Sequence, residues 1–309
     1  MTRPGYREFG SELRRTDEIA PTLGTVSRLR NSLDLVKTCW AVLRLDRSLL
    51  WLPALSIVSN LVTMVVFGSG VYLTRTHDLG TAWRPSVASY ALMFLAYLTM
   101  STITIFFNAA LISAANERLS GGDPTIESAL AGATARFGKI LPWAIVSATV
   151  STILRAVQER AGLLGRLVAG IAGIAWALIT FLVLPVIVME GLSVPAAVRR
   201  SKELFTRTWG EQMAGNVAIG LASFLAILLT LPLIVLAVVV PSTVITVVAV
   251  IVAVAWFAMV AVVAGAMSAI FQTALYRFAA TGETSTGFTP AQLSGAFVPK
   301  RSSRSGWSR

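Results

Sequence analysis

Long apolar runs separated by short polar connections divide most of the chain. A helix that crosses a bilayer needs about 20 mainly apolar residues, and six runs come near or exceed this length. The third run is the shortest and contains Pro142, while Pro241-Ser242 alone joins the last two, which predicts a tight helical hairpin. The pattern therefore predicts an all-α, polytopic bundle of six transmembrane helices. The predicted spans are Leu49–Tyr72, Val87–Ala114, Ile140–Val157, Leu167–Met189, Met213–Val240 and Thr243–Leu275.

Moderately polar stretches with a helical pattern precede each pair of predicted spans. The connections that enter the second and third pairs also resemble each other, because Glu117-Arg-Leu-Ser and Pro124 can be aligned with Glu190-Gly-Leu-Ser and Pro195. We interpret the spans as three repeated units of one cytoplasmic helix and two membrane helices, with chance similarity of apolar sequences as the alternative. The three polar stretches are Ser32–Arg47, Thr125–Lys139 and Val194–Trp209.

The second and third polar stretches carry signals for the start of a helix. Asp123 and Pro124 predict a cap and a first-turn proline for the second stretch, and Ser193 and Pro195 do so for the third. In the third stretch, apolar residues share a face with Trp209 and basic residues flank it. We expect amphipathic helices in the cytoplasmic headgroup layer. The alternative is that they only cover the cytoplasmic end of the bundle.

The composition also indicates a membrane protein. The 309 residues are 55% hydrophobic and 13% charged, whereas about a quarter of the residues in soluble domains are charged. The net charge is +11, but the basic residues are spread over tails and loops, which argues against nucleic acid as a partner. Charges of both signs before the first apolar run argue against a cleavable signal peptide. We divide the chain into a polar tail (1–30), a six-span membrane domain (31–280) and a basic tail (281–309) that we expect to be disordered.

The distribution of Lys and Arg predicts the orientation in the membrane. Of the 26 such residues, 21 lie in the two tails and in the second-to-third and fourth-to-fifth connections, and five lie in the other three connections. Cytoplasmic loops carry an excess of Lys and Arg. We therefore expect a multi-pass protein of the cell membrane with both termini in the cytoplasm.

Residues suited to catalysis or metal binding are scarce. His77 is the only histidine, and Cys39 is the only cysteine, so neither a metal cluster nor an internal disulfide is expected. The chain has no phosphate-binding glycine loop and no Gly-x-Ser-x-Gly elbow, and the interiors of the predicted spans lack carboxylates. We expect no catalytic residues, no metal and no cofactor, and we interpret Cys39 as an inert structural thiol.

Amide side chains are the strongly polar groups inside the predicted spans. Such groups in transporters contact substrates or ions, but more often they form hydrogen bonds between helices. Pro185 and Pro232 interrupt apolar runs and suit either a broken helix beside a cavity or a packed kink. The candidate intramembrane polar residues are Asn60, Asn108, Asn216 and Gln272.

Two carboxylates end apolar runs at the predicted cytoplasmic boundary. Glu190 and Glu117 can each pair with an arginine and so connect the end of a span to the following short helix. The sharper hypothesis is that they line a polar cavity, together with these arginines, that receives a lipid headgroup or a regulatory partner. The candidate site residues are Glu117, Glu190, Arg136, Arg199 and Arg200.

Three segments resemble a family of prokaryotic membrane proteins, DUF6159: Phe106–Ser113 (FFNAALIS), Pro185–Gly191 (PVIVMEG) and Arg200–Glu211 (RSKELFTRTWGE). The blocks Ser32–Leu55 and Gly287–Lys300 are also similar, so the resemblance covers about residues 30 to 300. It implies no activity and no site residues. A looser similarity of layout relates the chain to the membrane domain of some glycerophosphodiester phosphodiesterases, but the soluble catalytic domain of those enzymes is lacking, so their activity does not transfer.

Spans without candidate catalytic residues, together with basic flanking helices, favour a non-catalytic protein that binds lipid or a partner and organises a membrane process. The expected partners are membrane lipids, anionic ones included, and a protein partner or a second copy of the chain is compatible with the sequence. The alternative function is a small transporter or permease component, which the amides and prolines in the spans favour.

Overall fold

The computed structural model describes residues 36–44, 46–74, 86–160, 162–209, 222–224, 226–228 and 243–282, and every regular element in these ranges is helical. The predicted tail 1–30, residues 283–309, Asn216 and most of the fifth predicted span lie outside the described residues. Residues 36–44 form a first helical segment. The elements that follow are η1 (Arg47–Leu50), α2 (Trp51–Leu73), α3 (Val87–Leu119), α4 (Ile126–Thr134), α5 (Phe137–Arg160), α6 (Leu163–Thr180), α7 (Val183–Glu190), α8 (Val194–Trp209) and α11 (Thr243–Thr281).

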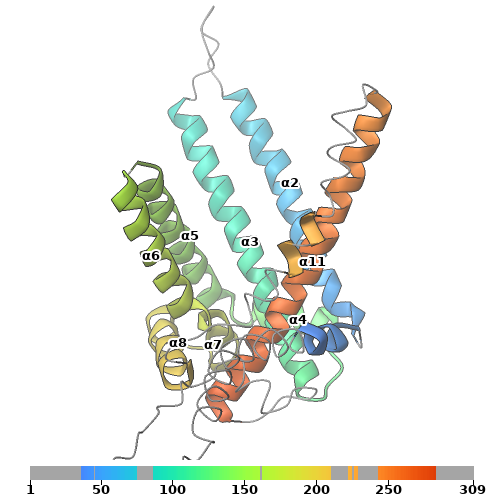
Figure 1. Cartoon of the computed structure of the whole chain (residues 1–309), viewed down its shortest axis with the longest axis vertical. Coiled ribbons are helices and arrows are strands. Elements are labelled where there is room, and N and C mark those ends of the chain that lie inside the picture. Colours follow the sequence, from blue (N-terminus) through green and yellow to red (C-terminus); the bar gives the residue numbers. More distant parts are fainter. Residues whose placement is uncertain are drawn as a thin grey trace, which may run out of the picture.

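The long helices run along the molecule, and the short helices gather at one end, where α4, α7 and α8 lie around the carboxyl end of α11 (Figure 1). Within the described ranges, five helical stretches are long and apolar enough to cross a membrane. They are Ser48–Leu73, Val87–Leu119, Phe137–Arg160, Gly165–Glu190 and Thr243–Thr281. The structure thus confirms the all-helical class and five of the predicted spans.

Two of these helices continue past the ends of their apolar runs. The second span was predicted to end at Ala114 but α3 continues to Leu119, and α11 continues from the predicted end at Leu275 to Thr281. The added turns carry polar residues such as Asn116 and Arg277. Hydropathy reports the part of a helix that contacts lipid, so the predicted spans stop where each helix enters the polar end of the bundle.

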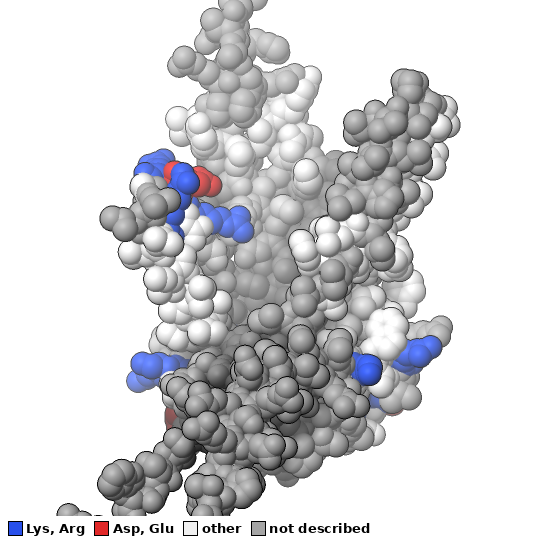
Figure 2. Space-filling model, in the orientation of Figure 1, with Lys and Arg blue, Asp and Glu red and all other residues white. Residues whose placement is uncertain are grey.

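The outer surfaces of the long helices are strongly apolar. Val65 on α2, Val87 on α3 and Val244 on α11 are 70%, 88% and 73% exposed. Figure 2 shows charged side chains at the lower end of the bundle and at the tip of the α5–α6 hairpin, with an uncharged surface between them. So much exposed apolar surface is suited to lipid rather than to water.

The core lies at the end where the short helices gather, and small residues allow close packing there. Ala109, Ala110 and Ala115 on α3 and Ala129 and Ala133 on α4 are fully buried. Small side chains let two helix backbones approach closely, which maximises van der Waals contact where lipid supplies no hydrophobic driving force. Helix α4 is therefore held on the last three turns of α3.

The start of α4 differs from the prediction. Asp123 was expected to cap this helix and Pro124 to occupy its first turn, but Thr125 is the N-cap and the helix begins at Ile126. Thr125 and Ser128 form a capping box, in which each side-chain oxygen accepts a hydrogen bond of 3.0 Å from the backbone N–H of the other. This box satisfies two helix N–H groups, whereas a cap at Asp123 would satisfy one. The predicted stretch also divides, since α4 ends at Thr134 and α5 already begins at Phe137.

The fourth predicted span is broken between α6 and α7 at Phe181 and Leu182. Pro185 contributes to the break because it has no N–H to bond the preceding turn. Ser201 of α8 repairs it: its hydroxyl donates to the carbonyl oxygen of Ile179 at 2.6 Å and accepts from the N–H of Leu182 at 3.2 Å. Ser201 is fully buried. Because an unsatisfied backbone group within the membrane costs several kcal/mol, this serine fixes α8 against the break.

The helical segment 36–44 packs on the same core through Cys39, Val42 and Leu43, which are 0%, 6% and 2% exposed. Burial raises the pKa of the Cys39 thiol to about 12. Since the thiolate is the reactive form, a raised pKa keeps this thiol protonated and unreactive at neutral pH.

Replacement of Gly132 by alanine tests the contact between α3 and α4. A Cβ at Gly132 would lie 3.0 Å from Cβ of Ser113 and closer still to its Oγ, whereas a Cβ at Gly138 on α5 would meet nothing within 4 Å. We expect Gly132→Ala to lower the free energy of unfolding by about 1–3 kcal/mol through overpacking. The control Gly138→Ala should leave it unchanged or slightly raised. Denaturation by SDS in mixed micelles measures both, and equal stability of the two variants would contradict the packing.

The single cysteine offers a test of the segment 36–44. With a pKa of about 12, roughly one Cys39 in ten thousand is a thiolate at pH 8. We expect N-ethylmaleimide to leave the native protein unlabelled at pH 8 and to modify it fully after denaturation in SDS. The control is Trp40→Cys in a Cys39→Ser background, because Trp40 is 43% exposed. Labelling of native Cys39 as fast as that of the control would show that the segment is not packed as described.

Candidate functional site

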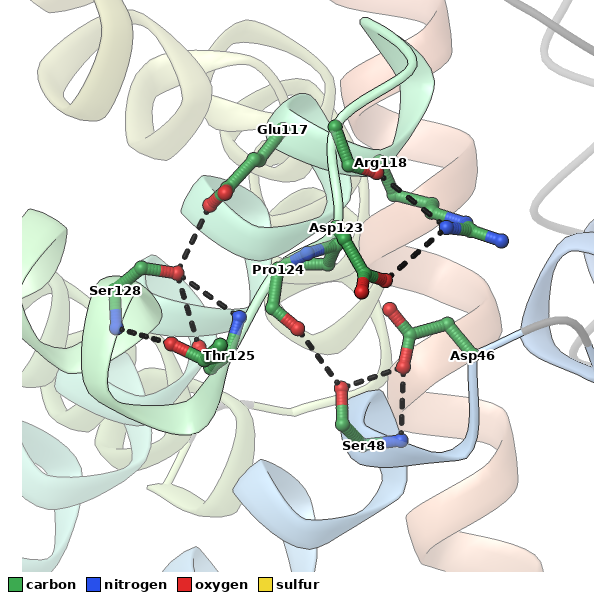
Figure 3. A network of polar contacts seen from close by, with 9 residues as sticks. Asp46, Ser48, Glu117, Arg118, Asp123, Pro124, Thr125 and Ser128 are labelled. Carbon is green, nitrogen blue, oxygen red and sulfur yellow. Dashed lines mark hydrogen bonds and ion pairs between the residues drawn. The ribbon is translucent and has the colours of Figure 1, made fainter.

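The turn between α3 and α4 joins two helix ends through side-chain hydrogen bonds (Figure 3). Glu117, in the last turn of α3, accepts a hydrogen bond from Oγ of Ser128 at 2.9 Å. Arg118 and Asp123 form an ion pair at 3.4 Å across the turn. Gly122 keeps the turn tight, because a Cβ there would lie 2.9 Å from Cγ of Glu117. Glu117 thus connects the end of a span to the short helix that follows it, with a serine as partner.

The start of α2 meets this turn from the other side. Oδ1 of Asp46 accepts hydrogen bonds from the backbone N–H and the hydroxyl of Ser48, at 3.0 and 2.5 Å. The Ser48 hydroxyl also lies 3.4 Å from the carbonyl oxygen of Pro124 (Figure 3). Asp46 caps η1 in this way and places the first span beside the α3–α4 turn.

The carboxyl end of α7 is a second junction. Gly191 ends the helix in the left-handed conformation, with φ of 63°, which favours glycine. Oε1 of Glu190 accepts hydrogen bonds from Nε of Arg200 on α8 at 3.2 Å and from the phenol of Tyr276 on α11 at 2.8 Å. One carboxylate therefore connects three helices. We call Glu190, Arg200, Tyr276, Arg136 and Lys139 the α7-end cluster.

The two remaining cations of this cluster contact backbone carbonyls at the end of α7. Nε of Arg136 lies 3.4 Å from the carbonyl oxygen of Val188, and Nζ of Lys139 donates to the carbonyl oxygen of Gly191. A helix leaves its last carbonyls without internal partners and carries a partial negative charge at that end. Two cations are therefore well placed there.

The arginine that pairs with Glu190 is held in its charged form. Burial opposes the charge of Arg200, but the hydrogen bond from Arg200 to Glu190 and the attraction of Glu190 and Glu203 raise its pKa above the usual value for arginine. The side chains of Arg200 and Glu190 are 29% and 26% exposed, so the pair is partly shielded from water. Arg199, by contrast, is exposed. The structure therefore brings together Glu190, Arg136 and Arg200 of the candidate site, while Glu117 lies in the other junction.

Arg277 is a polar-end residue that the sequence reasoning missed. From the end of α11 its Nη1 donates to Oδ1 of Asn116 at 3.0 Å and to Oγ of Ser120 at 2.5 Å, both at the end of α3. A cavity of about 350 Å³ lies beside it, between α3, α7 and α11. Its lining residues are Ser113, Asn116, Val188, Met189, Tyr276, Arg277 and Thr281. An arginine directly after a long apolar run was the signal that could have pointed to this position.

The candidate intramembrane amides do not gather in one place. Nδ2 of Asn60 on α2 donates to the hydroxyl of Thr104 on α3 at 3.1 Å. Asn108 is exposed on α3, and Gln272 is half-buried on α11. Among the described residues, no three His, Cys, Asp or Glu side chains are arranged to hold a metal ion.

Five apolar helices of membrane-spanning length and a polar end define this chain as a polytopic α-helical membrane protein. It belongs to DUF6159, a family of unknown function, whose model matches residues 87–288. This range is shorter than the resemblance expected from the sequence and leaves out the block Ser32–Leu55. No match is found among curated proteins.

The α7-end cluster can be tested through its carboxylate. Glu190→Gln retains the shape but removes the charge that Arg200 and Tyr276 contact, so we expect unfolding to become easier by about 1–2 kcal/mol. The control is Glu203→Gln, because the Glu203 side chain is 51% exposed and lies 3.6 Å from the same arginine. An exposed pair contributes about 0.5 kcal/mol or less. If both variants unfold at the same SDS concentration, the carboxylate does not hold the three helices together.

Proposed function

We propose that the chain is a non-catalytic, six-span protein of the prokaryotic cell membrane that binds anionic lipid headgroups at the end where its short helices gather. In this proposal that end faces the cytoplasm, both termini lie there, and α4, α8 and the segment 36–44 lie in the headgroup layer. The six spans form three units, each a short helix followed by a pair of spans.

Two parallel contacts support the repeated units. Glu117 lies in the last turn of α3 and accepts a hydrogen bond from Ser128 of α4, and Glu190 ends α7 and accepts one from Arg200 of α8. In each case the last carboxylate of a span holds the short helix that opens the next unit. The partner differs, since one is a neutral hydroxyl and the other a guanidinium.

The observation that carries the proposal is two pairs of exposed cations beside the apolar surface. Lys37 and Arg44 on the segment 36–44, and Arg199 and Lys202 on α8, are all exposed at the polar end. Anionic lipids attract basic residues near the membrane surface with about 1 kcal/mol for each Lys or Arg. Four exposed cations next to lipid-facing helices therefore suit anionic headgroups.

A transporter is the second candidate, because the span formed by α6 and α7 is interrupted, as substrate-binding helices of transporters often are. Here, however, Ser201 occupies the break with two hydrogen bonds. Asn60 likewise bonds to Thr104 of the neighbouring helix. Both features have a structural use, so they favour a packed bundle over a substrate path. Substrate flux into proteoliposomes would favour the transporter.

Lipid selectivity tests the proposed function. We expect native mass spectrometry of the protein in detergent to show tighter binding of phosphatidylglycerol than of phosphatidylcholine with the same chains. Arg199→Gln with Lys202→Gln should weaken phosphatidylglycerol binding by about tenfold or more, because each cation contributes about a factor of five. The matched control is Arg155→Gln with Arg160→Gln, which removes two exposed cations from the α5–α6 hairpin. Equal affinity for the two lipids would refute the proposal, and an equal loss in both double variants would refute the location.

A further inference from the structure

The cavity between α3, α7 and α11 has the residues of a small anion site. Its polar lining consists of a guanidinium, an amide, a phenol and two hydroxyls, and Val188 and Met189 add an apolar side. The hydroxyls of Tyr276 and Thr281 donate to Glu190 and to the carbonyl oxygen of Arg277, so the guanidinium, the Asn116 amide and the Ser113 hydroxyl are the donors that suit a ligand. Asn116, Met189 and Arg277 come from the last turns of three membrane-spanning stretches. The cavity is thus at the level where a span leaves the apolar layer.

The charges around the cavity favour a negative ligand. The lining of the cavity includes one cation, Arg277, and no carboxylate. Glu190 accepts a hydrogen bond from Tyr276 of the lining, and its charge is paired with Arg200. Arginine presents five N–H donors in a planar fork that fits the oxygens of a phosphate group. A phosphate group therefore suits the charge and the donors of this lining.

The volume indicates how much of a ligand the cavity holds. Ligand pockets in proteins measure about 300–1,000 Å³, and this cavity, at about 350 Å³, is at the small end. Such a space suits one headgroup with its first apolar atoms rather than a whole lipid. Thr281 and Gly282, at the end of α11, are exposed, so the cavity has an edge open to its surroundings.

We infer that this cavity binds a single phosphate ester, with Arg277 as its main charged contact and Asn116 as a positioning group. The inference rests on the proposed function and gives it a defined site. All seven lining residues fall within the range that the family model matches. A membrane phospholipid and a soluble phosphate ester share the recognised group, and the experiment below separates them.

Native mass spectrometry of the full chain, titrated separately with phosphatidylglycerol and with glycerol 3-phosphate, tests the site. We expect one phosphatidylglycerol to bind more tightly than the others, and Arg277→Gln to weaken this first binding event by about tenfold or more. The matched control is Arg118→Gln, which removes a cation from the same end of α3 but outside the cavity lining. Tight binding of glycerol 3-phosphate that Arg277→Gln abolishes would identify a soluble ester as the ligand and would equally support the site.

A second variant covers the case in which Arg277→Gln fails to fold. Thr281→Trp places a large side chain at the exposed edge of the cavity and leaves Arg277 in place, so it should also remove the first binding event. If wild type prefers phosphatidylglycerol but Thr281→Trp and Arg277→Gln bind it like Arg118→Gln, the cavity inference is wrong and the proposed function stands. If wild type binds neither phosphate ester selectively, both are wrong.

Discussion

The two hydrogen bonds of Ser201 are the interaction on which the polar end of the molecule depends. Lipid offers no partners for backbone groups, so a helix that breaks near the end of a span needs an internal donor and acceptor. Ser201 supplies both to Ile179 and Leu182. This contact fixes α8 beside the broken span, and only then can Arg200, one residue earlier, reach Glu190. The hydrogen bonds of Ser201 at the helix break thus help to position the α7-end cluster.

The lack of hydrogen-bond partners in lipid also explains why the sides of the long helices are apolar and the charged groups that connect helices lie at one end. Along the long helices, Ser and Thr hydroxyls donate to carbonyls of the preceding turn, as Thr63 does to Ser59 and Thr149 to Ile145, so little polarity reaches the lipid. The charged groups that connect helices, such as Glu190 and Arg277, are found instead at the end where α4, α7 and α8 lie (Figure 1). Exposed cations lie at the same end, and the proposed function assigns them to lipid phosphates.

The sequence correctly predicted features that depend on the local pattern of apolar and polar residues. The apolar runs predicted five described spans, and α8 begins at Val194, as predicted. Sequence reasoning failed at the cap of α4, where a Thr-Ser pair was a better cap than the acid two residues earlier. It did not find Ser201 or Arg277, because their partners lie 19 to 161 residues away and depend on how the helices pack. Most of the fifth predicted span and of the tails lies outside the described residues, so those predictions stand as made.

The central claim, that the end carrying the short helices faces the cytoplasm together with both termini, is tested most directly by reporter fusions. Green fluorescent protein fluoresces only when it folds in the cytoplasm, and alkaline phosphatase is active only outside it, so each reporter should be fused to either terminus. An even number of spans with the Lys and Arg excess inside predicts fluorescence and no phosphatase activity at both ends. Phosphatase activity at either terminus would contradict the orientation, and opposite results at the two termini would also exclude six spans.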